Sequence, residues 1–284
     1  MVDTINLDWN GQVPAIELLN GVVMPRIGLG TWPMDDGEAT IAVASALGLG
    51  YRLIDTAENY ENEAGVGAGI RHSGVKREEI FLTTKFNRKW HRVEGVRQAC
   101  EASLERLQTD YIDLLLIHWP NPDQDRYVEA FDGLTRLLDA GMVRAIGTSN
   151  FKPAHLERLF AAGFVPHVNQ IQLDPTHRRD DIVAIHEARG IVTESWSPLD
   201  RGDRLFTDSA VADIAQRLGR SPAQVVLRWH VQSGYVPVPK SSDPGRQSSN
   251  LAVFDFMLND DDMARLNDLD RPDPDMIDAD VFGH

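Results

Sequence analysis

The sequence predicts a single domain, residues 1–284, that folds as a (β/α)8 barrel. Eight short apolar runs alternate with amphipathic stretches of helical period, which is typical of a parallel sheet with crossover helices. The most apolar run, within residues 111–120, shows no polar alternation and therefore indicates a strand buried on both faces. The one clear hairpin pattern, at residues 16–23, precedes all eight runs. An open, doubly wound sheet is the alternative architecture.

The expected elements follow in chain order. Residues 16–19 and 22–23 flank Asn20 and Gly21, a dipeptide suited to a two-residue hairpin turn that could cap the bottom of a barrel. Strands are expected at residues 27–33, 53–55, 80–85, 112–118, 143–147, 168–171, 191–194 and 235–238. Helices are expected at about residues 36–47, 96–107, 127–138 and 180–188, with two more between the last two strands, split at residues 219–222.

The C-terminal part extends beyond the barrel pattern. A short extra helix is expected at about residues 260–269. The proline- and aspartate-rich end, from about residue 270, is expected to run over the surface as an acidic tail. So short a tail would leave the strand ends comparatively open.

The composition is that of a globular protein with an acidic balance. In total 28 Lys and Arg against 43 Asp and Glu give a formal charge of −15, which argues against a nucleic-acid partner or an anionic membrane. The first residues lack the pattern of a signal peptide, and no apolar stretch approaches the ~18 residues of a membrane span. The single cysteine, Cys100, lies at helical spacing with Val96 and Leu104 and is expected to pack in the core. These observations favour a cytoplasmic protein.

Titratable side chains stand where the predicted strands end, and in a barrel of this kind the carboxyl ends of the strands carry the chemistry. Asp55, Lys85 and His118 end three successive strands and lie 30 and 33 residues apart, close to one strand–helix unit. Each alone has an ordinary explanation, as a helix cap, a solvated charge or a rim residue. Together with Tyr60, just past Asp55, they predict one catalytic site.

These four side chains suit the reduction of a carbonyl group. A tyrosine hydroxyl has an ordinary pKa near ~10 and is a poor acid at neutral pH. A lysine cation nearby is expected to lower the pKa of Tyr60, and Asp55 would hold Lys85 charged and oriented. A neutral His118 would position the carbonyl oxygen, and a hydride donor would complete the reaction.

Several segments of the chain resemble the motifs of one known family, the aldo-keto reductases. These segments are residues 53–63, 114–120, 146–151, 169–170 and 239–242, the last with Arg246 and Asn250. The resemblance runs in order over nearly the whole chain, from about residue 16 to 269. Within the family, the chain most resembles bacterial reductases of the 2,5-diketogluconate reductase type.

The resemblance implies a TIM barrel that binds NADPH or NADP+ across the strand ends, with no metal, and that works as a monomer on a small carbonyl substrate. It implies that Tyr60 is the proton donor in reduction, that Lys85 and Asp55 tune it, and that His118 orients the carbonyl. The cofactor-binding residues that it implies are Thr31, Trp32, Ser149, Asn150, Gln170, Trp196, Ser197, Pro198, Leu199, Gly202, Lys240, Ser241, Ser242, Arg246 and Asn250.

The implied cofactor residues divide by the part of the cofactor that they would hold. Ser149, Asn150 and Gln170 would contact the nicotinamide carboxamide, with Trp196 against one face of the ring. Residues 197–202 would wrap the pyrophosphate. The adenosine 2′-phosphate would lie on Lys240, Ser241 and Arg246, which agrees with the preference of basic side chains for phosphate. Trp32, Trp90 and Trp119 would line the substrate pocket.

Some positions depart from the family pattern. Ser249 stands where a glutamate usually contacts the adenine, Trp196 stands where tyrosine is more frequent, and Phe86 with Asn87 replaces a common Leu-Trp pair in the pocket wall. Asp174 stands where histidine is common. None of these departures falls on the four catalytic positions.

Two further patterns are discounted. The glycines of residues 65–69 do not complete a dinucleotide-binding motif and follow no strand, so we expect a small-residue helix face that packs on the barrel. Asp174, His177 and His186 fit no common metal-ligand spacing, and we expect them on a solvated loop and helix face.

Two other functions remain open. Lys85 ends a barrel strand and could form an imine in a Schiff-base aldolase, although Lys240, Arg246 and Asn250 would then have no task. A non-enzymatic NADP-sensing or partner-binding barrel is the second, but such a module has no need of a proton donor.

Overall fold

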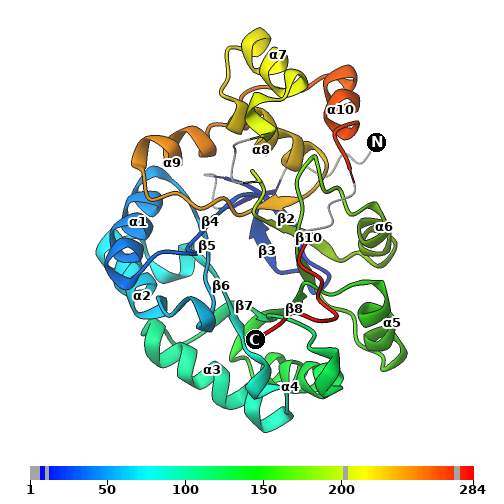
Figure 1. The fold of residues 1–284 in the computed structure, drawn as a ribbon. Coiled ribbons are helices and arrows are strands. Elements are labelled where there is room, and N and C mark those ends of the chain that lie inside the picture. The colour runs from blue at the N-terminus through cyan, green and yellow to red at the C-terminus, as the bar shows by residue number, and fades with distance from the viewer. Residues whose placement is uncertain (1–6, 10–12, 201–203, 272–275) are drawn as a thin grey trace.

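The structure, a computed structural model, describes residues 7–9, 13–200, 204–271 and 276–284. In this part of the chain, eight parallel strands form a barrel in which each strand pairs with the next (Figure 1). A bridge between Gly30 and Lys240, with a hydrogen bond of 3.2 Å from Gly30 N to Pro239 O, brings the last strand back to the first. The strands are β4 (Gly28–Gly30), β5 (Leu53–Asp55), β6 (Phe81–Phe86), β7 (Ile112–Ile117), β8 (Val143–Ser149), β9 (Val168–Gln172), β10 (Val192–Trp196) and β11 (Val236–Pro237). The predicted (β/α)8 barrel is confirmed, and the open sheet is wrong.

Helices surround the strands on the outside of the barrel (Figure 1). They are α1 (Asp36–Leu49), α2 (Glu63–Ser73), α3 (Val93–Leu107), α4 (Tyr127–Asp139), α5 (Pro153–Ala161), α6 (Asp180–Arg189), α7 (Ser209–Leu218), α8 (Pro222–Gln232), α9 (Pro244–Leu251) and α10 (Asp260–Asn267). Short 3-10 turns are η1 (Glu58–Tyr60), η2 (Arg77–Glu79), η3 (Arg88–Trp90), η4 (Pro122–Gln124) and η5 (Leu205–Thr207). The predicted break at residues 219–222 is confirmed, because Gly219 ends α7 with a φ of +61° and the Ser221 hydroxyl caps α8, accepting from Gln224 N.

An antiparallel sheet covers the bottom of the barrel. It consists of β1 (Leu7–Trp9), β2 (Val13–Glu17) and β3 (Val23–Pro25). Leu18 and Met24 are buried in one cluster with Leu53, at the start of a barrel strand. The predicted hairpin is confirmed, although β1 was not predicted. The turn is longer than two residues, because Leu18 N donates to Val22 O and Gly21, with a φ of +80°, donates to Leu18 O.

The core lies both inside the barrel and between its strands and helices. Every residue of β7 is buried, as the absence of polar alternation predicted. Cys100 is also fully buried, in the layer between strands and helices, so its predicted core position is confirmed.

The glycines of α2 serve helix–helix packing rather than contact with the strands. A Cβ on Gly65 would lie 2.2 Å from the backbone oxygen of Asp36, and one on Gly67 would lie 2.2 Å from that of Leu107. The first contact is with α1 and the second with the end of α3. The expectation that this face packs on the barrel itself is therefore wrong. Side chains larger than hydrogen would push the three helices apart.

Asp174, His177 and His186 are buried, so the expected solvated loop and helix face is wrong. The reason is that each group finds a partner inside the protein. The Asp174 carboxylate accepts from Thr176 and pairs with His177 at 2.8 Å, and the His186 ring contacts Asn169 and Thr193 at 2.9 and 2.8 Å. Among the described residues, one ligand atom each of Asp174, His177 and Asp200 lies within 4.8 Å of the others, but the contacts above already occupy both Asp174 oxygens.

A buried histidine predicts that the protein loses stability in mild acid. His91 is 1% exposed, and neither ring nitrogen has a hydrogen-bond partner among the described residues. Burial, reinforced by Arg88, lowers the pKa of His91 to about 4. The ring is thus neutral in the folded protein and binds a proton on unfolding, so the stability linked to it is present above its ordinary pKa and lost as the pH falls toward the lowered one.

We expect His91→Leu to make the free energy of unfolding less sensitive to pH in this window. One proton taken up on unfolding contributes about 1.4 kcal/mol per pH unit. Urea unfolding at several pH values should show that, as the pH falls below about 6.5, the free energy of unfolding decreases less in the variant than in the wild type. His72→Leu, at an exposed position, is the control. Parallel pH curves for wild type and His91→Leu would contradict the expectation.

Candidate active site

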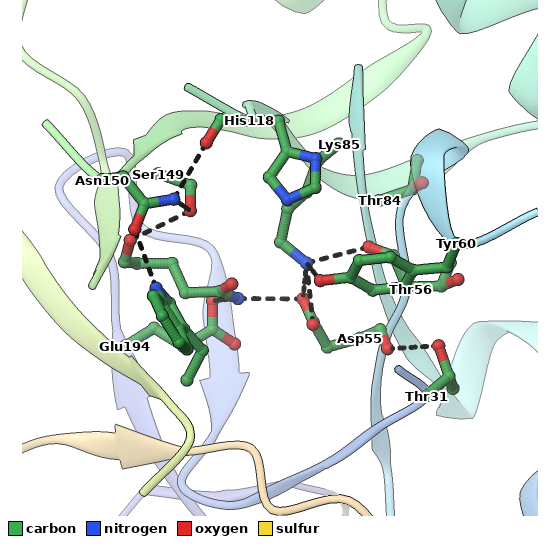
Figure 2. Close-up of polar contacts among 12 residues, drawn as sticks. Thr31, Asp55, Thr56, Tyr60, Thr84, Lys85, His118, Ser149, Asn150 and Glu194 are labelled. Atoms are coloured by element: carbon green, nitrogen blue, oxygen red, sulfur yellow. Dashed lines mark hydrogen bonds and ion pairs between the residues drawn. The ribbon is translucent and has the colours of Figure 1, made fainter. Parts of the chain in front are cut away.

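The site is built on a buried ion pair between neighbouring strands. Lys85, in β6, contacts both carboxylate oxygens of Asp55, at the end of β5, at 2.8 and 2.9 Å. The ammonium also donates to Thr56 O at 3.0 Å and lies 3.3 Å from the hydroxyl of Tyr60, which follows on η1 (Figure 2). Lys85 is fully buried. The strand order therefore brings the three predicted side chains to one point.

The charges at this point are mutually dependent. Burial alone would lower the pKa of Lys85, but Asp55, Tyr60 and Glu194 outweigh it and hold the pKa above its ordinary value, so the ammonium stays charged. Burial raises the pKa of Tyr60, and the attraction of Lys85 offsets only part of this increase. The expected net lowering of the Tyr60 pKa is thus wrong, because desolvation of the phenolate exceeds the effect of the Lys85 cation.

His118 lies beside this pair at the end of β7. Its ring centroid is 5.8 Å from that of Tyr60, and it is 5% exposed. Burial, together with the positive charge of Lys85 and the ring of His284, lowers the pKa of His118 far below its ordinary value. The imidazole is therefore neutral, as predicted, and Figure 2 shows it pointing toward the same space as Tyr60.

Side chains at the ends of β8, β9 and β10 form the neighbouring wall. Asn150 links the ends of β7 and β10: its amide nitrogen donates to His118 O at 3.1 Å and its oxygen accepts from the indole of Trp196 at 2.8 Å. The Ser149 hydroxyl donates to Gln170 O at 3.0 Å. These four predicted cofactor residues thus lie together, with Trp196 half-buried and next to the amides.

Glu194 belongs to this wall, and sequence reasoning missed it. Its carboxylate accepts from Gln170 Nε2 at 2.8 Å, and its other oxygen has no partner among the described residues. Burial and the nearby Asp55 raise the pKa of Glu194 well above its ordinary value. One signal was available: a carboxylate inside a run predicted to be a buried strand is rarely without a role.

The predicted phosphate residues lie at the edge of the barrel, beside α9. Lys240 contacts Glu38 at 3.3 Å, and the guanidinium of Arg246 is exposed, with no partner in the described part of the chain. Ser241 and Asn250 are buried and Ser242 is half-buried. A lysine, an unpaired arginine and two hydroxyls are a donor set that fits a phosphate group.

The other predicted cofactor residues are more scattered. Thr31 is buried and donates to Asp55 O at 3.0 Å, whereas Trp32 is 56% exposed. Ser197, Pro198 and Leu199 follow β10 directly. Gly202 lies outside the described residues.

The acidic end of the chain covers the site instead of leaving it open. The C-terminal end of the chain lies next to β7 and β8 (Figure 1). Phe282 packs on Trp119 with ring centroids 4.8 Å apart, and the ring centroids of His284 and His118 are 4.9 Å apart. Lys152 holds the segment through ion pairs with Asp278 and Asp280 at 2.7 and 2.5 Å. The expected open site is thus wrong, because Lys152 pairs with the aspartates of the tail and Phe282 packs on Trp119.

Two of the predicted pocket tryptophans, Trp119 and Trp90, lie close to the site. Trp119 is 5% exposed beneath Phe282. The half-buried Trp90 donates through its indole nitrogen at 3.0 Å to Glu58, in the same 3-10 turn as Tyr60. Asn150, Trp196 and residues 276–279 of the tail help to line a cavity of about 210 Å³.

The sequence profile described as the aldo/keto reductase family matches residues 26–271 of this chain. The chain belongs to the aldo/keto reductase family. Methylglyoxal reductase DkgA of Yersinia pestis is 43% identical over 275 residues, which is 94% of this reductase and 98% of that protein. Morphine 6-dehydrogenase of Pseudomonas putida is 44% identical over 290 residues, which is 96% of this chain and 98% of that protein. A crystal structure of a Gox0644 mutant in complex with NADPH matches with a TM-score of 0.90 at 42% identity, over 94% of this chain and 98% of that one.

These findings confirm the predicted family and its barrel. The finer resemblance to 2,5-diketogluconate reductases stays a prediction. Within the described residues, this reductase has no helix both long and apolar enough to pass through a membrane.

Proposed function

We propose that this reductase converts aldehydes or ketones to alcohols with NADPH, and that Tyr60 donates the proton. The observation that carries the proposal is the chain of contacts from Asp55 through Lys85 to the Tyr60 hydroxyl, beside a neutral imidazole. The proton donor Tyr60, the cation Lys85 and the carbonyl-orienting His118 thus lie together.

The roles follow from the charges. NADPH, when bound, supplies the hydride that adds to the carbonyl carbon. The Tyr60 hydroxyl gives its proton to the carbonyl oxygen, and Lys85 stabilises the phenolate that remains. A ring N–H of His118 donates to the same oxygen and orients it. Solvent then returns a proton to Tyr60, so the balance is one hydride and one proton per alcohol formed.

Different residues of the chain would hold the nicotinamide and the 2′-phosphate of the cofactor. Ser149, Asn150 and Gln170 offer polar atoms close to Trp196, whose indole N–H donates to Asn150 Oδ1, which suits a carboxamide next to an aromatic ring. Lys240, Ser241, Ser242 and Arg246 suit the 2′-phosphate.

We propose a small carbonyl compound as the substrate. The tail narrows the entrance by placing Phe282 and His284 over Trp119 and His118. Relatives named for methylglyoxal and for morphine have similar sequence identity to this chain. The particular carbonyl compound must therefore be identified by assay. Steady-state rates of NADPH oxidation with aldehydes, dicarbonyls, α-keto acids and quinones test the proposal; no oxidation with any of them would sink it.

The Schiff-base alternative is disfavoured by the state of Lys85. An imine-forming amine must be neutral and reachable, whereas Lys85 is fully buried, charged and surrounded by oxygen acceptors. Trapping with borohydride and a small aldehyde should therefore leave Lys85 unmodified. A sensing role without catalysis leaves the Tyr60–Lys85 contact without a purpose. A monomeric state and a cytoplasmic location remain predictions.

Arg246→Ala is expected to weaken NADPH far more than NADH. A hydrogen bond to a charged group contributes about 1.5–3 kcal/mol, so the loss for NADPH should be roughly tenfold to a hundredfold, and near zero for NADH, which lacks the 2′-phosphate. Dissociation constants of both cofactors check this. The control is Arg136→Ala, whose guanidinium pairs with Asp132 on the surface of α4. Equal weakening of the two cofactors would move the phosphate site elsewhere.

A further inference from the structure

We propose that Glu194 is a positioning residue: with Asp55 it holds the side-chain amide of Gln170 in one orientation, so that Gln170 Oε1 accepts a hydrogen bond from the nicotinamide carboxamide. This inference rests on the proposed function, because it requires the cofactor to bind beside Trp196. It adds a residue that the comparison of sequence motifs did not point to.

The geometry of three strands creates the arrangement. Gln170 and Glu194 are directly paired positions on the neighbouring strands β9 and β10. Gln170 Nε2 lies between two acceptors, 2.9 Å from Asp55 Oδ2 and 2.8 Å from Glu194 Oε2. An amide nitrogen carries two hydrogens, and here each has its own acceptor.

Two acceptors on the same nitrogen fix which way the amide faces. Rotating the amide by half a turn would bring Gln170 Oε1 against the Asp55 carboxylate oxygen, with no hydrogen between them, and would take both N–H groups away from their two acceptors. Asp55 alone would hold one hydrogen and leave the other free. The pair of carboxyl groups therefore selects one orientation.

The fixed orientation leaves the oxygen of the Gln170 amide, Oε1, available to a ligand. Gln170 Oε1 has no hydrogen-bond partner among the described residues, so it is free to accept from a ligand. The adjacent Ser149 is the paired position on β8. Gln170 thus presents an acceptor, and not a donor, to the carboxamide, whose N–H groups need one.

The burial of Glu194 argues that this residue does not serve stability alone. Glu194 is 0% exposed, and its Oε1 has no partner in the described part of the chain. A buried polar atom without a partner destabilises a protein, and an apolar side chain at this position would avoid that penalty. The presence of a buried carboxyl group here fits a function in the site.

The test compares ligands that differ in one N–H group. NADP+ carries the carboxamide, whereas its 3-acetylpyridine analogue keeps the carbonyl and replaces the amino group by methyl. Adenosine 2′,5′-bisphosphate lacks the nicotinamide altogether. Dissociation constants measured by calorimetry for all three give a readout independent of turnover.

Wild type should bind NADP+ about tenfold more tightly than the analogue, the value of roughly one hydrogen bond. Glu194→Leu should reduce this preference, because only Asp55 then holds the Gln170 amide and the rotated orientation becomes more populated. Glu194→Gln, which retains an acceptor oxygen, should keep most of it. All variants should bind the bisphosphate like wild type. Ser195→Ala, on the same strand at a buried hydroxyl without a partner, is the matched control.

The outcomes separate the two proposals. Failure of wild type to bind NADP+ would refute the proposed function itself. Binding by wild type with an unchanged preference in Glu194→Leu would overturn the role of Glu194 alone. Weaker binding of all three ligands, the bisphosphate included, would show general damage and also overturn it, as would a Glu194→Gln variant no better than Glu194→Leu.

Discussion

Tyr60→Phe is expected to remove most of the turnover while leaving NADPH affinity nearly unchanged. The substitution deletes only the hydroxyl that lies 3.3 Å from Lys85 and keeps the ring that packs against His118. A positioned proton donor contributes about 10²–10⁴-fold in rate, so kcat should fall by that factor. The proton is transferred in the transition state, so the loss should appear in kcat and not in the dissociation constant of NADPH.

The matched control is Tyr111→Phe. Its hydroxyl lies far from the site and donates to Arg77 O at 3.3 Å, so turnover should be retained. Carbonyl reduction by Tyr60→Phe at close to the wild-type rate would refute the assignment of the proton donor. An equal loss in both variants would point to a general effect of losing a tyrosine hydroxyl.

Lys85→Met should have the largest effect on stability. It leaves the Asp55 carboxylate buried without its counter-ion, and breaking a buried pair from one side costs about 3–5 kcal/mol. Turnover should fall too, since no cation remains to stabilise the Tyr60 phenolate. Urea unfolding and the rate of NADPH oxidation measure the two effects separately.

The double variant Asp55→Asn with Lys85→Met distinguishes structure from catalysis. Removing the stranded charge should recover much of the lost stability, because the asparagine oxygen can still accept from Gln170. Turnover should stay low. If the double variant is as unstable as Lys85→Met alone, the ion pair does not account for the loss of stability.

Local features made much of the fold and half of the site predictable. The apolar run of β7 identified a strand buried on both faces. Ser221 followed by Pro222 marked the start of a helix. Because parallel strands of a barrel end on one face, the strand spacing alone was enough to predict that Asp55, Lys85 and His118 lie together.

The features that the sequence left open depend on distances between segments far apart in the chain. Nothing in the composition of the tail shows that Phe282 finds Trp119 and that Lys152 holds Asp278. The net direction of the Tyr60 pKa depends on the balance of burial against Lys85, and neither can be read from spacing.

By itself, then, the sequence determined which side chains reach the rim of the barrel, because period and strand order are local properties. Only the tertiary structure decided how those side chains are paired, covered and charged. Glu194 illustrates the difference: in the sequence it is one acid in a short apolar run, and in the fold it shares the amide of Gln170 with Asp55. Hydrogen bonding and desolvation act over a few ångströms in space, whatever the separation along the chain.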